Sequence, residues 1–215
     1  MARKLDQPQH RGDFFKSLGT LFAGFVAEQV EDAVTGIAPK LLRPPGALEE
    51  FAFLVACTRC DKCIKACPQD SLRKAMSSAG LAVNTPYVEP RSMPCFLCTD
   101  LPCIPACPDG ALLWPKRALA GGEVVEGPRA VKMGTVRILE DLCLTWDRGE
   151  DQPAQACRTC VDRCPYPGVA IDVKDTEDGR VPHPVVSADD CTGCGLCVFG
   201  CPTPKAALVV DPRRD

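Results

Sequence analysis

The chain has 215 residues and a formal net charge of −3 at pH 7, and it contains no long basic run, which argues against a nucleic-acid partner. Pro (21) and Gly (17) are abundant and aromatic residues make up only 6%, so we expect short elements and many turns rather than long helices and broad sheets. Sixteen cysteines dominate the composition, in a chain longer than the usual disulfide-stapled secreted domain.

Residues 1–46 contain no cysteine, and their pattern predicts an N-terminal helical extension. Between Phe14 and Ile37, apolar side chains recur at helical spacing, and charged residues such as Glu28 fall mainly on another arc. The segment is therefore predicted to form an amphipathic helix, which the prolines of "LRPPG" end.

The apolar part of this helix is too short to cross a membrane. The uncharged run Ser17–Ala27 would span roughly 16 Å, against about 30 Å for a bilayer core. We predict no transmembrane span, and we expect the helix to dock on a partner subunit or on the rest of its own chain. The alternative is a position on a membrane surface.

Residues 47–215 carry all the cysteines, which sort without remainder into four groups of four. Every group ends in Cys-x-x-x-Cys-Pro. In chain order, the groups are Cys57, Cys60, Cys63 and Cys67; Cys95, Cys98, Cys103 and Cys107; Cys143, Cys157, Cys160 and Cys164; and Cys191, Cys194, Cys197 and Cys201.

The first and fourth groups match the C-x₂-C-x₂-C-x₃-C-P run that binds [4Fe–4S] clusters in bacterial ferredoxins. The two-residue gaps wrap the backbone around an iron–sulfur cube, and the three-residue gap aims the last cysteine at a neighbouring cluster. The second and third groups are looser variants, since Cys143 precedes its companions by a thirteen-residue gap. We predict that all sixteen cysteines are metal and cofactor ligands, which fill four [4Fe–4S] clusters completely.

Zinc is the alternative metal, because it also takes four cysteines from C-x₂-C pairs. Zinc motifs usually separate two such pairs by a longer spacer, which does not suit four successive cysteines followed by proline. Small or apolar neighbours such as Gly193, Gly195 and Ile64 let backbone amides approach the cluster sulfides. The alternative explanation for these three residues is turn geometry and core filling.

The order in which the groups pair is open on sequence alone. The first could pair with the second and the third with the fourth, or the second and third could form a unit inserted between the others. We expect the inserted arrangement, by analogy with iron–sulfur subunits of membrane-linked oxidoreductases.

Short apolar, β-branched segments flank the cysteine groups and predict small strands. These are "MGTVRILEDLC" and "GVAIDV" around the third group, and "PHPVVSADDC" and "AALVVD" around the fourth. Residues 117–130 are predicted to form a long connection, and Asp175–Arg180 a solvated turn. The fold class is therefore α+β: a duplicated bacterial dicluster ferredoxin fold, in which small β-hairpins and short helices surround the clusters, preceded by the N-terminal helix.

The chain has no full set of titratable catalytic groups, so we predict that it is not an enzyme by itself. His10 and His183 are its only histidines, and His183, between two prolines, is predicted to lie in a surface loop rather than to bind metal. Trp114 and Trp146 are predicted to serve packing rather than redox chemistry.

Several phrases outside the cysteine motifs carry a family resemblance: "LRPPGALEEFAFLVACTRCDKCIKACPQDSL", "AGLAVNTPY", "PCFLCTDLPCIPACPDGAL" and "CTGCGLC". With them, most of residues 41–205 resembles the MauM/NapG family of ferredoxin-type electron-transfer proteins. The resemblance implies four [4Fe–4S] clusters that pass electrons between a quinol-linked membrane partner and a downstream redox enzyme. It also implies that the sixteen cysteines are the cluster ligands.

The chain departs from the family at its N-terminus, where members usually begin with a twin-arginine export signal. Here "HRGDFFK" retains Arg11, but Gly12 replaces the second arginine, and no small-residue cleavage site is clear. We therefore expect a retained helix and a cytoplasmic location, with membrane association through a partner. The alternative location is periplasmic.

The leading hypothesis is an electron-relay subunit in a respiratory chain or a larger oxidoreductase complex. Such a subunit would form a hetero-oligomer, and its partners would be a catalytic subunit, a quinol-oxidising membrane protein, or both. The second hypothesis is the iron–sulfur subunit of a soluble molybdenum or tungsten oxidoreductase. The third is a zinc protein that serves assembly. Metal content separates the third hypothesis from the first two, and co-purifying partners separate the first from the second.

Overall fold

The computed structural model describes residues 40–119, 122–146, 153–175 and 181–213. The predicted helix between Phe14 and Ile37 lies outside these residues, as does the predicted turn except for its first residue, Asp175. Residues 39–215 cluster by their contacts into one unit. In the described part of the chain, no helix is long and apolar enough to cross a membrane.

All helices of the described residues are short, as the many turn-forming residues predict. The α-helices are α2 (Glu50–Ala56), α3 (Lys62–Lys65), α4 (Thr159–Asp162) and α5 (Leu196–Gly200). The 3₁₀ turns are η1 (Ser77–Ala82), η2 (Gly127–Ala130) and η3 (Glu140–Leu142). Such elements bury little apolar surface alone, so their stability depends on the packing around the cysteines.

The strands of the described residues form four two-stranded antiparallel sheets. The pairs are β1 (Leu72–Lys74) with β2 (Pro86–Val88), β3 (Lys116–Ala118) with β4 (Val124–Glu126), β5 (Gly134–Ile138) with β8 (Leu208–Pro212), and β6 (Ile171–Lys174) with β7 (His183–Val186). The strands predicted around the third and fourth cysteine groups are therefore confirmed. Only the β5–β8 pair joins segments far apart in the sequence, and it encloses both of these groups.

The connection predicted over residues 117–130 is wrong, because this segment contains most of the β3–β4 hairpin and then η2. Lys116 lies opposite Glu126, and their charged ends are 2.6 Å apart. Gly122 supplies a φ of 80° at the turn, where a side chain would be strained. Gly121 and Gly122 interrupt the apolar pattern of this stretch, so no clear strand pattern is visible in the sequence.

His183 also differs from its prediction, since it lies in strand β7 and not in a surface loop. Its ring stacks on that of Trp146, with the centroids 4.0 Å apart. Trp146 in turn packs against the apolar core of the C-terminal half, which confirms its structural role.

Residues 40–46, predicted to belong to the N-terminal extension, pack into the described unit. Leu42 is buried and bridges to Val88 of β2. The buried Arg43 forms an ion pair with Glu50, and its guanidinium lies 4.7 Å from the ring centre of Phe53. These contacts fix the start of the unit, because a buried charge requires a partner.

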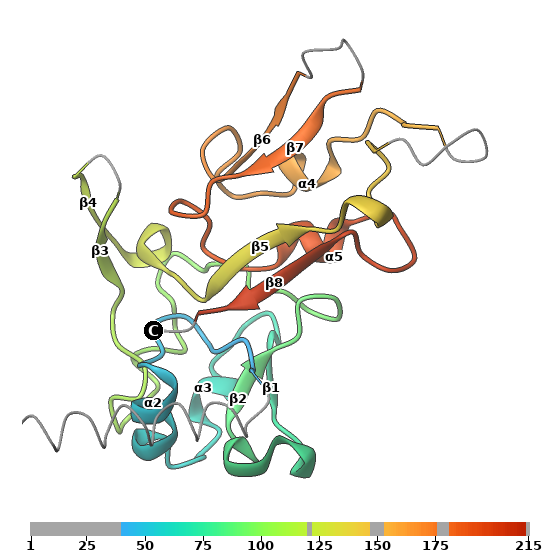
Figure 1. Cartoon of the computed structure of the whole chain (residues 1–215). Helices are drawn as coiled ribbons and strands as arrows, with labels where there is room; N and C mark the ends of the chain where they lie inside the picture. Colours follow the sequence, from blue (N-terminus) through green and yellow to red (C-terminus); the bar gives the residue numbers. More distant parts are fainter. Residues whose placement is uncertain (1–39, 120–121, 147–152, 176–180, 214–215) are drawn as a thin grey trace, which may run out of the picture. The chain divides into compact units, whose positions relative to one another are not determined.

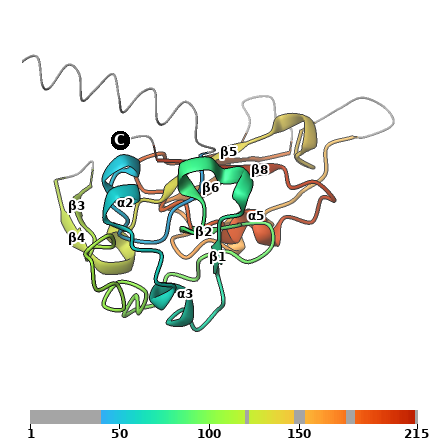
Figure 2. The same ribbon diagram turned by 90° about the horizontal axis from the view of Figure 1, so that it is seen from below.

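Three apolar clusters hold the unit together, and cysteines belong to the two larger ones. The larger core surrounds the first two cysteine groups and the fully buried Phe53, and the second surrounds the last two groups. In Figure 1, the β6–β7 hairpin and α4 lie on one side of the β5–β8 sheet, whereas α2, α3, β1 and β2 lie on the other. Figure 2 shows the unit from the side of these last elements.

Candidate metal centres

The sixteen cysteines gather into four sets, three of which line cavities. The remaining four also lie together: Cys57, Cys60 and Cys107 are close enough to Cys63 for their charges to raise its pKa. Set A is Cys57, Cys60, Cys63 and Cys107; set B is Cys67, Cys95, Cys98 and Cys103; set C is Cys164, Cys191, Cys194 and Cys197; set D is Cys143, Cys157, Cys160 and Cys201.

Each set takes three cysteines from one sequence group and the fourth from another. Cys67 of the first group lies in set B, and Cys107 of the second lies in set A. Cys164 and Cys201 are exchanged in the same way between sets C and D. The first group therefore pairs with the second and the third with the fourth, and the expectation of an inserted unit is wrong.

Local backbone geometry explains the exchange. The three-residue gap before the last cysteine forms a helical turn, so that the N–H of Cys67 bonds to Ile64 and that of Cys107 to Ile104. In a continuing helix, the last cysteine would lie on the same face as the cysteine four residues before it. The proline after the last cysteine ends the helical turn, so this cysteine can point to the neighbouring set instead. The C-terminal half repeats the pattern with α4 and α5.

The loops between paired cysteines share an unusual conformation. Arg59, Leu97 and Gly193 each precede the second cysteine of a Cys-x-x-Cys pair, and their φ angles are 59°, 50° and 73°. Asp61 and Gly195 follow that second cysteine in the first and fourth groups, with φ angles of 62° and 85°. Turns of alternating hand point successive N–H groups to one side, where they attract an anion. The turn geometry suggested for Gly193 and Gly195 is confirmed.

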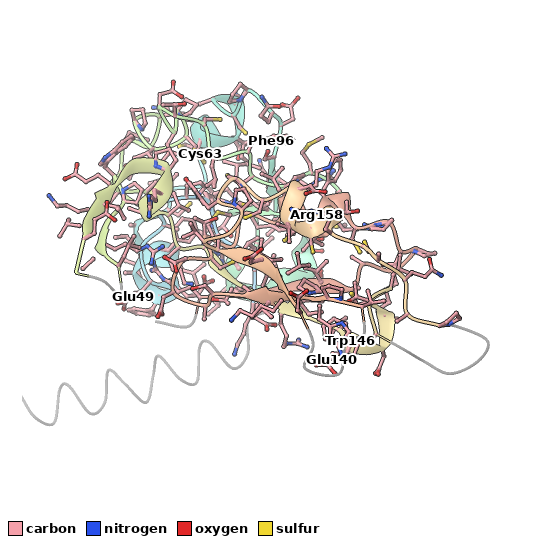
Figure 3. All side chains as sticks on the ribbon, turned by 90° about the horizontal axis from the view of Figure 1, so that it is seen from above. Glu49, Cys63, Phe96, Glu140, Trp146 and Arg158 are labelled. Atoms are coloured by element: carbon pink, nitrogen blue, oxygen red, sulfur yellow. The ribbon has the colours of Figure 1, made fainter. Side chains whose placement is uncertain are left out.

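The four sets follow one another in the order A, B, C, D. The Cys103 thiol of set B has Cys63 of set A among its neighbours, and Cys197 of set C has Cys160 of set D. Sets B and C meet where the N–H of Cys95 bonds to the carbonyl oxygen of Cys194 at 2.9 Å. Figure 3 shows Cys63 of set A far from Trp146, which follows Cys143 of set D.

Burial makes bare thiolates unfavourable in these sets. Burial is the main cause that raises the pKa of the Cys63 thiol to about 11 and the pKa of Cys95 and of Cys103 to about 12, and neighbouring thiolates contribute to these values. It likewise raises the pKa of Cys160 to about 12. Thiols of this kind lose their protons at neutral pH only when a cation takes the proton's place, as iron or zinc does.

Set A reaches the surface. Cys60 is the one exposed cysteine of the sixteen, all of which lie in the described residues. Its pKa is lowered, first by the backbone N–H of Lys62, so this thiol ionises more readily than the buried ones.

Backbone N–H groups reach the sulfurs of the exchanged cysteines. Ser71 donates to Cys67, Tyr166 to Cys164 and Ala207 to Cys201, each at 3.4 Å. Hydrogen bonds to ligand sulfur stabilise the negative charge that an iron–sulfur cluster carries.

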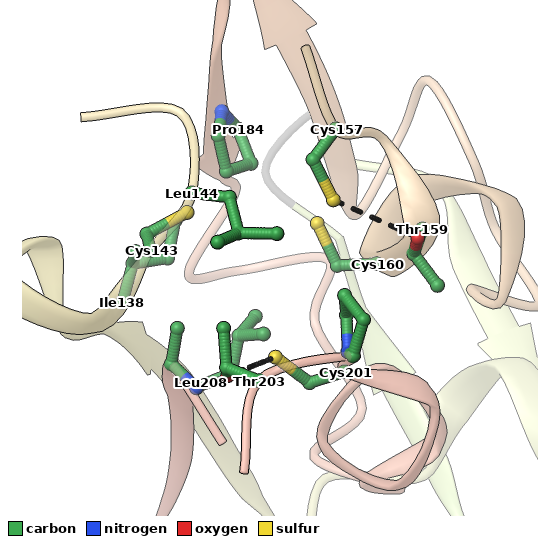
Figure 4. A pocket seen from close by; sticks show the side chains of 12 residues that line it. Ile138, Cys143, Leu144, Cys157, Thr159, Cys160, Pro184, Cys201, Thr203 and Leu208 are labelled. Atoms are coloured by element: carbon green, nitrogen blue, oxygen red, sulfur yellow. Dashed lines mark hydrogen bonds between the residues drawn. The ribbon is translucent and has the colours of Figure 1, made fainter. Parts of the chain in front are cut away.

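Set D also has three threonine hydroxyls next to its sulfurs, which the sequence analysis missed. Thr145 lies 3.3 Å from the sulfur of Cys143, Thr159 lies 3.6 Å from Cys157, and Thr203 lies 3.0 Å from Cys201. Figure 4 shows the last two contacts at the cavity wall. The signal was present as a Cys-x-Thr step that recurs at three of the four cysteines.

The sulfurs are arranged for a cofactor with several metal atoms. Among the described residues, no three His, Cys, Asp or Glu side chains converge closely enough to hold a single ion. In each of sets B, C and D, the four cysteines instead line the walls of one cavity. A [4Fe–4S] cube places its four irons at separate corners, each of which can take one thiolate, so four cysteines around one cavity fit it.

Comparison with known families identifies the same chemistry. Residues 154–205 match the 4Fe-4S dicluster domain, which covers most of the third group and the whole fourth group, and residues 56–73 match a 4Fe-4S binding domain. The chain thus matches families that bind [4Fe–4S] clusters in both halves.

Full-length relatives are found among ferredoxin-type proteins. The methylamine utilization ferredoxin-type protein MauM of Methylorubrum extorquens is 36% identical over 91% of this chain and 83% of its own length, and that of Paracoccus denitrificans is 35% identical over 98% and 89%. The ferredoxin-type protein NapG of Escherichia coli is 34% identical over 93% and 83%. No solved structure matches the chain significantly.

Proposed function

The chain belongs to the MauM/NapG family of ferredoxin-type electron-transfer proteins, and from this premise we propose that it relays single electrons through four [4Fe–4S] clusters held by sets A to D. Like its relatives it is an electron carrier and not an enzyme. When bound, each cluster takes up and releases one electron without making or breaking a bond to a substrate.

The observation that carries the proposal is the exchange of cysteines between neighbouring sets. Cys67 and Cys107 tie set A to set B, and Cys164 and Cys201 tie set C to set D. Each exchange holds two cofactor sites at a fixed separation, which is what a relay requires and a set of independent structural metal sites does not. In this proposal all sixteen cysteines are cluster ligands.

The residues of this chain do three things for the relay. The cysteine exchange within each half and the Cys95–Cys194 hydrogen bond between the halves order the sites in a line. The buried cores exclude water from most sulfurs, and the N–H groups of the loops stabilise the negative charge of the ligands. The duplicated dicluster ferredoxin fold, made of residues 47–215 with residues 40–46 packed against them, is the architecture that this arrangement supports.

The partners are redox proteins at the two ends of the line. We assign one docking surface to the neighbourhood of Cys60, the exposed cysteine of set A, and the other to the end that carries set D. The partners proposed are a quinol-oxidising membrane protein and a downstream redox enzyme, in a cytoplasmic complex. Recovery of the protein with a large molybdenum or tungsten subunit would instead assign it to a soluble oxidoreductase, and recovery from the periplasm would overturn the location.

The test is anaerobic purification followed by metal analysis and EPR of the reduced protein. We expect a brown protein with about sixteen irons per chain, which is four clusters of four. A colourless protein loaded with zinc would rule out every redox function. An iron content near eight, at full folding, would mean that one pair of sets holds no cluster.

A further inference from the structure

Sets C and D are neighbours of the same kind, but they differ in the hydroxyl groups near their sulfurs. In set D, Thr145 is fully buried with its hydroxyl 3.3 Å from the sulfur of Cys143, and the half-buried Thr159 lies 3.6 Å from that of Cys157. In set C, one hydroxyl, that of Thr192, acts on Cys194.

The direction of these bonds follows from the ligand state. A cysteine that binds iron has lost its proton, so its sulfur can only accept, and the hydroxyls of Thr145 and Thr159 must donate. Thr203 is different, because its hydroxyl also lies 2.7 Å from the carbonyl oxygen of Lys205, to which it donates. A hydroxyl has one proton, so Thr203 contributes less to Cys201 than the other two contribute to their sulfurs.

A hydrogen bond to a ligand sulfur is stronger when the cluster holds an extra electron, because the sulfur is then more negative. Donors therefore favour the reduced state and raise the reduction potential. Exposure does not separate the two sets, since each has three buried cysteines and one half-buried one, Cys157 in set D and Cys164 in set C.

We propose that Thr145 and Thr159 raise the reduction potential of the cluster in set D above that of set C, so that an electron in the C-terminal half rests at set D. The proposal rests on the proposed function. One electron leaves the site in set C, which is oxidised, and arrives at the site in set D, which is reduced, and no proton or covalent bond is involved. Of the two sites in the C-terminal half, set D is then the one on which the electron resides before it passes to a redox partner.

The test is a redox titration followed by EPR, on the anaerobically purified full chain and on Thr145→Val and Thr159→Val, separately and together. Valine keeps the shape of threonine and removes only the donor. The signal of set D is identified as the one that Cys157→Ser alters. We expect the ratio of reduced set D to reduced set C to fall in each variant, and by about tenfold in the double variant.

Three further variants control the sign and the specificity. Thr192→Val removes the hydroxyl of set C, so the same ratio should rise. Thr203→Val should change the ratio less than Thr145→Val, and Thr99→Val, next to Cys98 of set B, should leave it unchanged.

The outcomes separate this proposal from the proposed function. Absence of [4Fe–4S] signals from the unmodified protein overturns the function. If the signals are present, a ratio that stays constant in Thr145→Val and Thr159→Val, or that falls equally in Thr192→Val, overturns only the role of the threonines. Should the buried Thr145→Val variant fail to bind iron, the ratio of reduced set D to reduced set C in the half-buried Thr159→Val variant tests the proposal alone.

Discussion

The backbone N–H of Cys95 donates a hydrogen bond of 2.9 Å to the carbonyl oxygen of Cys194, and this bond joins set B to set C. The same contact region holds Pro90 against Gly195, where a Cβ atom would come within 2.6 Å of the proline ring. The relay therefore depends at its midpoint on two backbone segments that lie about a hundred residues apart in sequence.

Replacing Gly195 with alanine should separate sets B and C. The new Cβ would force Pro90 back by about 1 Å to reach a normal carbon–carbon contact. The magnetic interaction between neighbouring reduced clusters falls steeply with distance, so we expect a weaker spin–spin splitting in the EPR spectrum of fully reduced Gly195→Ala. Spectra at two microwave frequencies distinguish this splitting from g-anisotropy.

Gly168→Ala is the matched control for that variant. Gly168 has a φ of 74°, close to the 85° of Gly195, but a Cβ there meets nothing within 4 Å. Both variants should lose about 1–2 kcal/mol of unfolding free energy from the left-handed conformation alone, and only Gly195→Ala should lose more. Equal changes in the EPR splitting of the two variants would show that backbone strain, and not the contact with Pro90, is responsible.

Arg91→Gln should weaken the attachment of the N-terminal half to α5. The guanidinium donates to the carbonyl oxygens of Val198 and Cys201 at 2.9 and 3.0 Å, and to those of Thr203 and Pro204 at 2.9 and 3.3 Å. Hydrogen bonds from a charged donor contribute more than neutral ones, so we expect a loss of about 1–2 kcal/mol in urea unfolding of the iron-loaded protein.

The exposed Arg73 of β1 provides the control for Arg91, since Arg73→Gln should change stability by less than about 0.5 kcal/mol. A loss in Arg91→Gln no larger than in Arg73→Gln would mean that the four carbonyl contacts do not hold the halves together.

Cys67→Ser should alter a cluster whose other ligands come from the second sequence group. Cys67 lines the same cavity as Cys95, Cys98 and Cys103, so the EPR signal of set B should change while that of set A stays as it was. Cys60→Ser is the converse variant and should alter set A alone. Damage confined to set A in the Cys67→Ser protein would contradict the exchanged arrangement.

The iron-free, fully reduced protein should lose stability at alkaline pH. Burial raises the pKa of Cys95 and Cys103 from an ordinary 9.0 to about 12 in the folded state. The contribution of these two protonated thiols to the free energy of unfolding is therefore complete below pH 9. It is lost as the pH rises from 9 toward 12, because the thiols of the unfolded chain lose their protons at a lower pH than those of the folded chain.

The iron-loaded protein gives the comparison for this pH dependence. Its cysteines carry no proton in the folded state, so the decline above pH 9 should be absent from it. Thermal unfolding of both forms at pH 7.5 and pH 10, under a reducing anaerobic atmosphere, measures the difference. A parallel decline in the two forms would assign the effect to groups other than the thiols.

The sequence by itself determined which residues are the candidate ligands and the local structure around them. The Cys-x-x-Cys spacing and the prolines after Cys67 and Cys201 fix how the chain wraps each cofactor, and the β-branched runs beside the third and fourth groups fix strands β5 to β8. These features depend on neighbours a few residues away, and spacing and composition report such neighbours directly.

Only the tertiary structure decided which groups pair and in what order the sets follow. The exchange of Cys67 with Cys107, the bond from Cys95 to Cys194 and the long-range pairing of β5 with β8 all join distant segments. Similar cysteine motifs are able to pair in several ways, so their spacing alone does not decide the choice. The cysteine exchange within each half shows the pairing, and packing between the two halves, with its glycine contact and its arginine–carbonyl bonds, decides the order of the sets.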